Sequence, residues 1–300
     1  MHKKMKISLM ILMITSGSLM GCNVTKLEDN TLQNQESTTI QKKEQIKYSN
    51  LVDDKTQKEV EQILLKLGVS EQSVDTFIEW VKDFNSKVGR PMAFKEGFTG
   101  SDAAQVDYGD VILDTGNSDS DNLQMDTNCR LAAYLLFRDF VNTDTKIDEP
   151  DNYLMFDIEA INTDDKYKFI KEEPDKFNAI FNPVLVDKGT DASKHEKQIQ
   201  EEWQKRGISF KENTDISLIT VFMHDPYENK RFVGHTGVLI KENDDLLFIE
   251  KYGPYLPYQC TKFSSEQEVV DYLLSRKDFY GDGTEARPII MKNNVVISNN

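Results

Sequence analysis

The sequence takes on β-strand character at residues 216–252, where it contains ISLITVFM (216–223), FVGHTGVLI (232–240) and LLFIEKY (246–252). These stretches are rich in β-branched and aromatic residues, and Asn243-Asp244-Asp245 supplies turn chemistry between the last two. Two shorter stretches near the end of the chain, 288–292 and 295–298, have the same character. The second half of the chain is therefore predicted to form an antiparallel sheet.

The segments before these strands have a helical pattern. Apolar residues recur at helical spacing over 51–67 and 71–84, and Gly68 between them is a predicted C-cap. The run 131–141 is apolar nearly all round, which is typical of a buried helix. Further helix-like stretches cover 166–181 and 193–206. We expect an α+β fold in which N-terminal helices and a buried central helix pack on the antiparallel sheet.

Residues 1–21 have the pattern of an export signal. Lys3, Lys4 and Lys6 precede a short apolar stretch that does not reach the roughly 20 residues of a transmembrane helix. Leu19-Met20-Gly21-Cys22 resembles the lipobox of bacterial lipoproteins. The resemblance implies cleavage before Cys22, acylation of its thiol and a lipid-anchored protein on the extracytoplasmic face of the cell membrane. An ordinary secretory signal with a chance cysteine is the alternative.

The remaining chain divides into a tether and a domain. Residues 22–50 are polar without hydrophobic periodicity, so we expect the lipidated cysteine and a disordered tether there, followed by a single α+β domain at 51–300. The net charge of −15 argues against a nucleic-acid partner. The four histidines are scattered and no cysteine pair has zinc-site spacing, so we expect no metal or cofactor. His224 is expected in a turn at a strand end and His195 on a solvated helical face.

Cys129 is the first candidate for chemistry. It lies in the first turn of the predicted buried helix, where Asp126, Thr127 or Asn128 serves as the N-cap. The partial positive charge of a helix N-terminus favours a thiolate, and Arg130 adds a nearby cation. Two alternatives stay open. Cys129 is a packing residue, or it forms a disulfide with Cys260, as an exported protein permits.

His235 and Glu250 are the candidates for a base and its orienting partner. If the strands at 233–241 and 246–252 form a hairpin about Asn243-Asp244, Glu250 lies opposite Gly237 and on the same face as His235. That diagonal is about 7–8 Å, within reach of a glutamate side chain. A half-buried carboxylate needs a partner, which His235 supplies. The alternative is a solvent-facing Glu250 on an edge strand.

The order Cys129, His235, Glu250 resembles the papain-like superfamily, and within it the NlpC-like cell-wall peptidases and amidases. Their His-x-Gly-[Ile/Val] strand is similar to His235-Thr236-Gly237-Val238, although Arg130 stands where that family usually has serine. The resemblance covers about residues 122–260 and implies a nucleophile, a base and an orienting residue in that order. The whole chain also resembles a family of Gram-positive lipoproteins of unknown function, through segments such as Tyr48-Ser49-Asn50-Leu51 and Asn128-Cys129-Arg130.

These features predict a membrane-anchored, extracytoplasmic thiol hydrolase or acyltransferase that acts on an amide or ester bond, with a cell-wall peptide as one candidate substrate. A second oxyanion donor is needed beside the Cys129 backbone N–H. The candidates are Gln124, Asn122, Asn128 and Gln259, and we expect it from Gln124. The alternative is a non-catalytic binding lipoprotein with the same fold, in which Cys129 is buried or disulfide-linked. The sequence leaves the substrate and the oligomeric state open.

Overall fold

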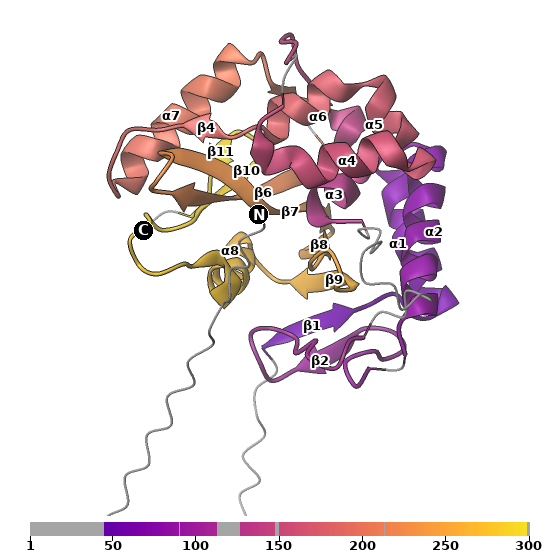
Figure 1. The fold of residues 1–300 in the computed structure, drawn as a ribbon. Coiled ribbons are helices and arrows are strands. Elements are labelled where there is room, and N and C mark those ends of the chain that lie inside the picture. Colours follow the sequence, from indigo (N-terminus) through magenta and orange to yellow (C-terminus); the bar gives the residue numbers. More distant parts are fainter. Residues whose placement is uncertain (1–44, 90, 113–126, 148–149, 213, 299–300) are drawn as a thin grey trace, which may run out of the picture. The chain divides into compact units, whose positions relative to one another are not determined.

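An antiparallel sheet of nine strands is the centre of the fold (Figure 1). The computed structural model describes residues 45–89, 91–112, 127–147, 150–212 and 214–298. The strand order is β11-β10-β6-β7-β8-β9-β1-β2, and β4 pairs with β7 off this path. The strands of this sheet are β1 (Ile46–Ser49), β2 (Thr99–Ser101), β4 (Val184–Leu185), β6 (Ile216–Asp225), β7 (Lys230–Glu242), β8 (Asp245–Lys251), β9 (Tyr258–Phe263), β10 (Ile289–Lys292) and β11 (Val295–Val296). A separate pair joins β3 (Val141–Asn142) to β5 (Ser209–Phe210).

Helices cover both faces of this sheet. Figure 1 shows α3 to α7 on one side of the strands and α8 on the other, with α1 and α2 along one flank. The α-helices are α1 (Asp54–Lys66), α2 (Glu71–Lys87), α3 (Cys129–Phe137), α4 (Met155–Thr163), α5 (Lys168–Glu172), α6 (Pro174–Phe181), α7 (Ala192–Lys205) and α8 (Glu266–Leu274). Within the described residues, none of these helices combines the length and the apolar character needed to cross a membrane.

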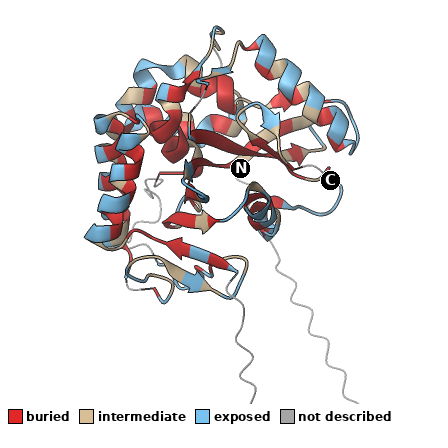
Figure 2. Ribbon diagram, turned by 180° about the vertical axis from the view of Figure 1, so that it is seen from behind, coloured by how far each residue is buried: buried red, intermediate tan, exposed pale blue. Residues whose placement is uncertain are grey.

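Two hydrophobic cores lie on the two faces, and β6 contributes to both by alternation. Leu218 and Phe222 pack with side chains of α1 to α7, while Ile219 and Val221 pack with side chains of α8. Figure 2 shows the central strands almost entirely buried. The central strands are therefore apolar on both sides, which explains the continuous hydrophobic run of their sequence.

A β-bulge between β6 and β7 sets the direction of His235. Val221 pairs with His235, but the next residue, Phe222, pairs with Val233, so Gly234 is the extra residue on β7. Without the bulge, His235 and Val233 would share a face. With it, His235 lies beside Val221 on the α8 face. A Cβ on Gly234 would lie 1.9 Å from the Met223 sulfur, so a larger residue at this bulge would displace the Met223 side chain.

The α+β class predicted from the sequence is confirmed, and the helices predicted before and after Gly68 are α1 and α2. Gly68 has φ +88°, as a left-handed C-cap requires. The predictions for the end of the tether, for His195 and for His224 were wrong. Residues 46–50 were assigned to the tether, but β1 lies between β9 and β2 in the sheet. His195 was expected in solvent, but it is buried and its Nδ1 accepts a hydrogen bond from Arg231.

Several predictions fall on residues that the structure does not describe. They are the export signal at 1–21, the acylated Cys22, most of the tether and the oxyanion candidate Gln124. His224, expected in a turn, is instead a buried residue within β6.

Candidate active site

The three residues predicted to act together lie in contact. The His235 Nε2 atom is 2.6 Å from Glu250 Oε2, and the Cys129 thiol shares a hydrogen bond with the His235 side chain. All three side chains are buried, with exposed fractions of 8% for Cys129 and 2% for each of the other two. Glu250 occupies Nε2, which leaves Nδ1 as the ring nitrogen available to the thiol. The contacts form the chain thiol, imidazole, carboxylate, and the catalytic roles of its members stay predictions.

The local sequence places Cys129 at the N-terminus of α3. Asn128 is the N-cap, because its side chain accepts a hydrogen bond of 3.0 Å from the Leu131 N–H and its backbone is extended. Its amide nitrogen also donates to Asp157 Oδ1 at 2.7 Å. The backbone N–H of Cys129 belongs to the first turn, where an α-helix provides no carbonyl partner. That N–H is therefore one donor for an oxyanion next to the thiol.

A gap in the strand pairing lets α3 approach β7. On the edge of β7 that faces away from β6, β4 pairs with Lys230 and Arg231, and β8 begins to pair at Gly237. Residues 232–236 have no strand partner on that edge among the described residues. Arg130 uses this gap, because its Nη1 donates to the Val233 carbonyl at 3.0 Å. An ion pair of 2.5 Å with the buried Asp157 holds the guanidinium there.

The hairpin of β7 and β8 has the predicted register. Gly237 lies opposite Glu250, and Asn243-Asp244 forms a two-residue loop with Asn243 at φ +56°. This register puts Glu250 on the face of His235. The solvent-facing alternative for Glu250 is therefore wrong. Lys251 is also buried, on the other face, where its Nζ lies 3.8 Å from the centre of the Phe84 ring.

Two further groups hold the Glu250 carboxylate, and the sequence analysis missed both. The Tyr272 hydroxyl donates to Oε1 at 2.5 Å, and Arg276 Nη1 lies 3.3 Å from Oε2. Tyr272 lies in α8 and Arg276 comes just after its end, and the sequence analysis did not predict this helix. Its start carries a recognisable signal, because Ser265 caps the Glu268 N–H and Glu268 returns a bond to the Ser264 N–H. The sequence therefore contained a signal for the helix but none for its contact with Glu250.

A buried polar network continues behind Glu250. Gln259 Nε2 donates to the Tyr272 hydroxyl at 2.8 Å, and its Oε1 accepts from the Tyr108 hydroxyl at 2.6 Å. Asn50 Nδ2 then donates to the Tyr108 oxygen at 2.7 Å. These groups are buried and mutually bonded, so they fix the position of the carboxylate.

Charge and burial act on the pKa of each member of the site. Burial raises the pKa of the Cys129 thiol, but the hydrogen bond to His235 and the positive charges of His235 and Arg130 lower it below its ordinary value. Burial and the Arg276 charge lower the pKa of His235, but its bonds to Cys129 and Glu250 raise it on balance. Burial raises the pKa of Glu250, yet His235, Arg276 and Tyr272 hold it below the ordinary value. These directions favour a thiolate, an imidazolium and a carboxylate.

The second cysteine differs from Cys129. Both cysteines of the described part are free thiols, so they do not form the disulfide that the sequence left open. Cys260 lies inside β9 with no exposed surface, and burial raises the pKa of its thiol far above the ordinary value. It is therefore an inert packing residue and a natural internal control. The described residues contain no group of three His, Cys, Asp or Glu side chains placed to hold a metal ion.

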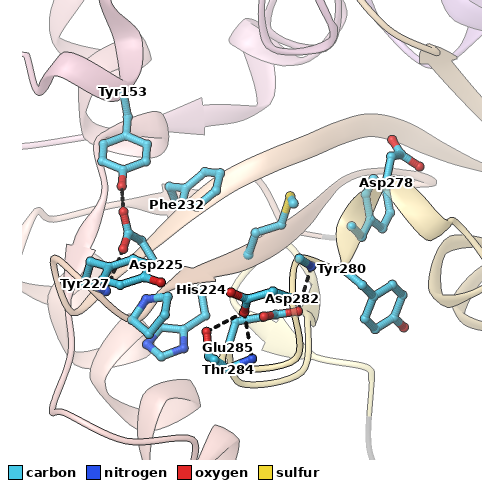
Figure 3. A pocket seen from close by; sticks show the side chains of 14 residues that line it. Tyr153, His224, Asp225, Tyr227, Phe232, Asp278, Tyr280, Asp282, Thr284 and Glu285 are labelled. Carbon is cyan, nitrogen blue, oxygen red and sulfur yellow. Dashed lines mark hydrogen bonds between the residues drawn. The ribbon is translucent and has the colours of Figure 1, made fainter. Parts of the chain in front are cut away.

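A pocket of about 480 Å³ lies next to His235, and Figure 3 shows side chains that line it. Phe279 connects the two, because it lines the pocket and its ring centre is 5.5 Å from that of His235. Met223 also lines the pocket. Its sulfur lies over the bulge at Gly234, the residue before His235.

Comparisons with known proteins add a family but no activity. No curated protein matches the chain, and no solved structure matches it. The family model described as Domain of unknown function (DUF4300) matches residues 47–297, which span every strand of the sheet from β2 to β11 and all three residues of the candidate site. The chain belongs to this DUF4300 family.

Proposed function

We propose that the domain is a thiol hydrolase or acyltransferase with a papain-like arrangement of Cys129, His235 and Glu250, acting on an amide or ester bond. The observation that carries the proposal is the buried contact chain from thiol to imidazole to carboxylate, in which His235 Nε2 is 2.6 Å from Glu250. A nucleophile needs a base, and the base needs an orienting group. A purely structural cysteine needs neither.

The reaction follows from these contacts. The Cys129 thiolate forms a bond to the substrate carbonyl carbon, and the carbonyl electron pair moves to oxygen, where the Cys129 N–H stabilises it. When the tetrahedral intermediate collapses, the bond to the leaving amine or alcohol breaks, and His235 transfers its Nδ1 proton to that group. A thioester remains. Water then gives a proton to His235 and adds to the thioester, and the thiolate leaves; an amine or alcohol acceptor in place of water gives acyl transfer.

Glu250 stays ionised throughout this cycle. Tyr272, Arg276 and His235 stabilise its charge, so it orients the ring and stabilises the imidazolium without taking the proton. Arg276 also lowers the pKa of His235, which makes the imidazolium a better acid. Glu250 and Arg276 therefore act in opposite directions on the acid strength of His235.

The proposal includes a lipid anchor at Cys22, which would place the domain on the extracytoplasmic face of the membrane. Its support is the segment Leu19-Met20-Gly21-Cys22 and the charged, short leader before it. Acyl chains attach a protein through about 0.8 kcal/mol for each buried methylene. In the native host, Cys22→Ser is expected to move the protein out of the membrane fraction. Retention of the variant in that fraction would argue against the anchor.

Mass spectrometry of candidate substrates tests the chemistry. The protein is incubated with muropeptides and, separately, with denatured protein, next to Cys129→Ser and Cys260→Ser. We expect new hydrolysis products, or a mass added to the Cys129 peptide, with the native protein and with Cys260→Ser but not with Cys129→Ser. Reactivity that survives in Cys129→Ser would sink the proposal. A Cys129 thiol that no alkylating reagent reaches would instead favour the non-catalytic binding lipoprotein.

A further inference from the structure

The geometry points to the pocket beside His235 as the subsite for an ammonium group carried by a peptide substrate. This inference rests on the proposed function, because it names the substrate class of the same site. The pocket is about 480 Å³ and adjoins the imidazole through Phe279 and Met223. A group bound there therefore lies on the His235 side of the site, next to Phe279.

Carboxylates give the pocket its charge. Asp225, Asp278, Asp282 and Glu285 line it, and its lining contains no lysine or arginine among the described residues. Asp278 is engaged, because its Oδ2 lies 2.7 Å from Arg276 Nη2. Figure 3 shows Asp225 on one side of the pocket and Asp282 with Glu285 on the turn beside it. These three carboxylates have no ion-pair partner in the described part of the chain.

The loop geometry keeps these carboxylates ionised and in place. Glu285 accepts hydrogen bonds from the Gly281 and Gly283 N–H groups at 2.7 and 3.0 Å. Asp282 accepts from the Thr284 N–H at 3.0 Å, and Asp225 accepts from the Tyr227 N–H at 2.8 Å and from the Tyr153 hydroxyl. Bonds of this kind lower the pKa of all three carboxyl groups. Their negative charge therefore persists at neutral pH.

Aromatic side chains supply the second element of ammonium recognition. Tyr153, Tyr227, Phe232, Phe279 and Tyr280 line the pocket, and Tyr227 is 82% exposed. A cation over the face of such a ring is attracted by the negative charge density of that face. Exposed aromatic rings next to unpaired carboxylates suit a cation on an apolar stem and offer little to an anion.

His224 adds a polar group that the fold leaves without a partner. It lines the pocket with an exposed fraction of 7%. Its Nδ1 accepts a hydrogen bond of 2.9 Å from the Ala286 N–H, so the neutral ring carries its proton on Nε2. That Nε2 has no hydrogen-bond partner in the described part of the chain. Burial and the Arg231 charge lower the pKa of His224 to about 4, so the ring adds no positive charge to the pocket lining and keeps one N–H donor without a partner in the described part of the chain.

Binding to the full chain carrying Cys129→Ser tests the inference without any turnover. The probes are Nα-acetyl-lysine amide, with a side-chain ammonium, Nε-acetyl-lysine amide, with an α-ammonium, and the diacetylated amide, which has no charge. Isothermal titration at low salt is expected to show binding of one or both charged probes and none of the neutral one. The two charged probes separate the two sources of an ammonium group.

Two matched double variants identify the site. Asp282→Asn with Glu285→Gln is expected to lower the affinity for the charged probe by about threefold to tenfold. Added salt is expected to lower that affinity further. Glu201→Gln with Glu212→Gln removes the same charge from exposed positions elsewhere and is expected to leave affinity unchanged. Equal binding of all three probes, no binding at all, or equal losses in both double variants would overturn the inference. None of these results depends on the reactivity of Cys129, so failure of the pocket and failure of the thiol chemistry are separate outcomes.

Discussion

Burial and charge act in opposite directions on the Cys129 thiol. A buried thiol prefers its neutral form, as Cys260 shows, whose pKa is raised by burial and by the charge of Glu250. Cys129 is also buried, but His235 and Arg130 outweigh burial and lower its pKa. Two cysteines of one domain therefore have opposite properties, and the cause is their neighbours rather than their exposure.

Removal of the imidazole should reverse the balance at Cys129. His235→Ala deletes the hydrogen bond and the positive charge but leaves the burial, so the pKa of the thiol is expected to rise. One pKa unit reduces the thiolate fraction about tenfold near neutral pH, so alkylation by iodoacetamide should slow by at least about that factor. Mass spectrometry of the Cys129 peptide measures the rate. Cys260→Ser is the control and should react like the native protein, and an unchanged rate in His235→Ala would contradict the assigned base.

Glu250 should raise the pH at which the His235 imidazolium loses its proton. Its carboxylate raises the pKa of His235, and an imidazolium is present below that pKa and lost as the pH rises through it. Glu250→Gln removes the negative charge, so this loss should occur at lower pH. An NMR titration of the His235 ring protons measures the midpoint. Arg276→Met should move the midpoint upward, because the Arg276 charge lowers the pKa of His235; two shifts in the same direction would be inconsistent with the assigned contacts.

At the scale of elements, the site depends on how two strands and a helix meet. The bulge at Gly234 directs His235 to the α8 face, and the short β4 leaves residues 232–236 open on one edge. Arg130 bonds to the Val233 carbonyl in this gap, which brings the start of α3 to the imidazole. The position of the thiol is therefore coupled to the irregular part of β7.

Close packing of β7 on β8 makes Gly237 sensitive to substitution. A Cβ there would lie 2.6 Å from the Ile249 carbonyl oxygen, which is backbone and does not move aside easily. Gly237→Ala is expected to reduce the free energy of unfolding by about 1–3 kcal/mol. Gly89→Ala is the matched control, because no heavy atom lies within 4 Å of its added Cβ, and its effect should stay within about 0.5 kcal/mol. Urea denaturation gives both values, and similar losses in the two variants would refute this explanation.

At the scale of the whole molecule, the domain buries a histidine pair that the candidate site does not use. The rings of His195 and His224 are 4.9 Å apart, and the Arg231 guanidinium bonds to His195 Nδ1 at 3.1 Å. Burial and this cation lower the pKa of both rings, with that of His224 at about 4. The fold therefore holds both histidines neutral.

This pair predicts a loss of stability in mild acid. An unfolded histidine binds its proton below about pH 6.5, whereas folded His224 does so only near pH 4. The unfolded state binds more protons between these values, so the free energy of unfolding falls as the pH falls through this window. His224→Asn keeps an acceptor for the Ala286 N–H and should flatten the dependence. Urea denaturation across the window measures it, and an equally steep dependence in the variant would exclude His224 as its source.

Part of the site was predictable because its determinants are local. The hairpin register followed from a two-residue loop at Asn243-Asp244, which sets every later pair, including Gly237 with Glu250. Cys129 at a helix start followed from a capping residue and the apolar run behind it. β9 and α8 were missed, because the polar side chains of Gln259, Thr261 and Lys262 conceal the strand and α8 is short.

Periodicity, capping and turn chemistry act over a few residues, so the sequence alone was sufficient for the α+β class, for most strands and helices, and for the proposed trio. Tertiary contacts were needed for the bulge that turns His235 toward the α8 face, for the inclusion of β1 in the sheet, and for Tyr272 and Arg276 at Glu250. Tyr272 and Arg276 lie 22 and 26 residues from Glu250 along the chain. Their contacts depend on how α8 packs against the sheet, and no local sequence pattern encodes that packing.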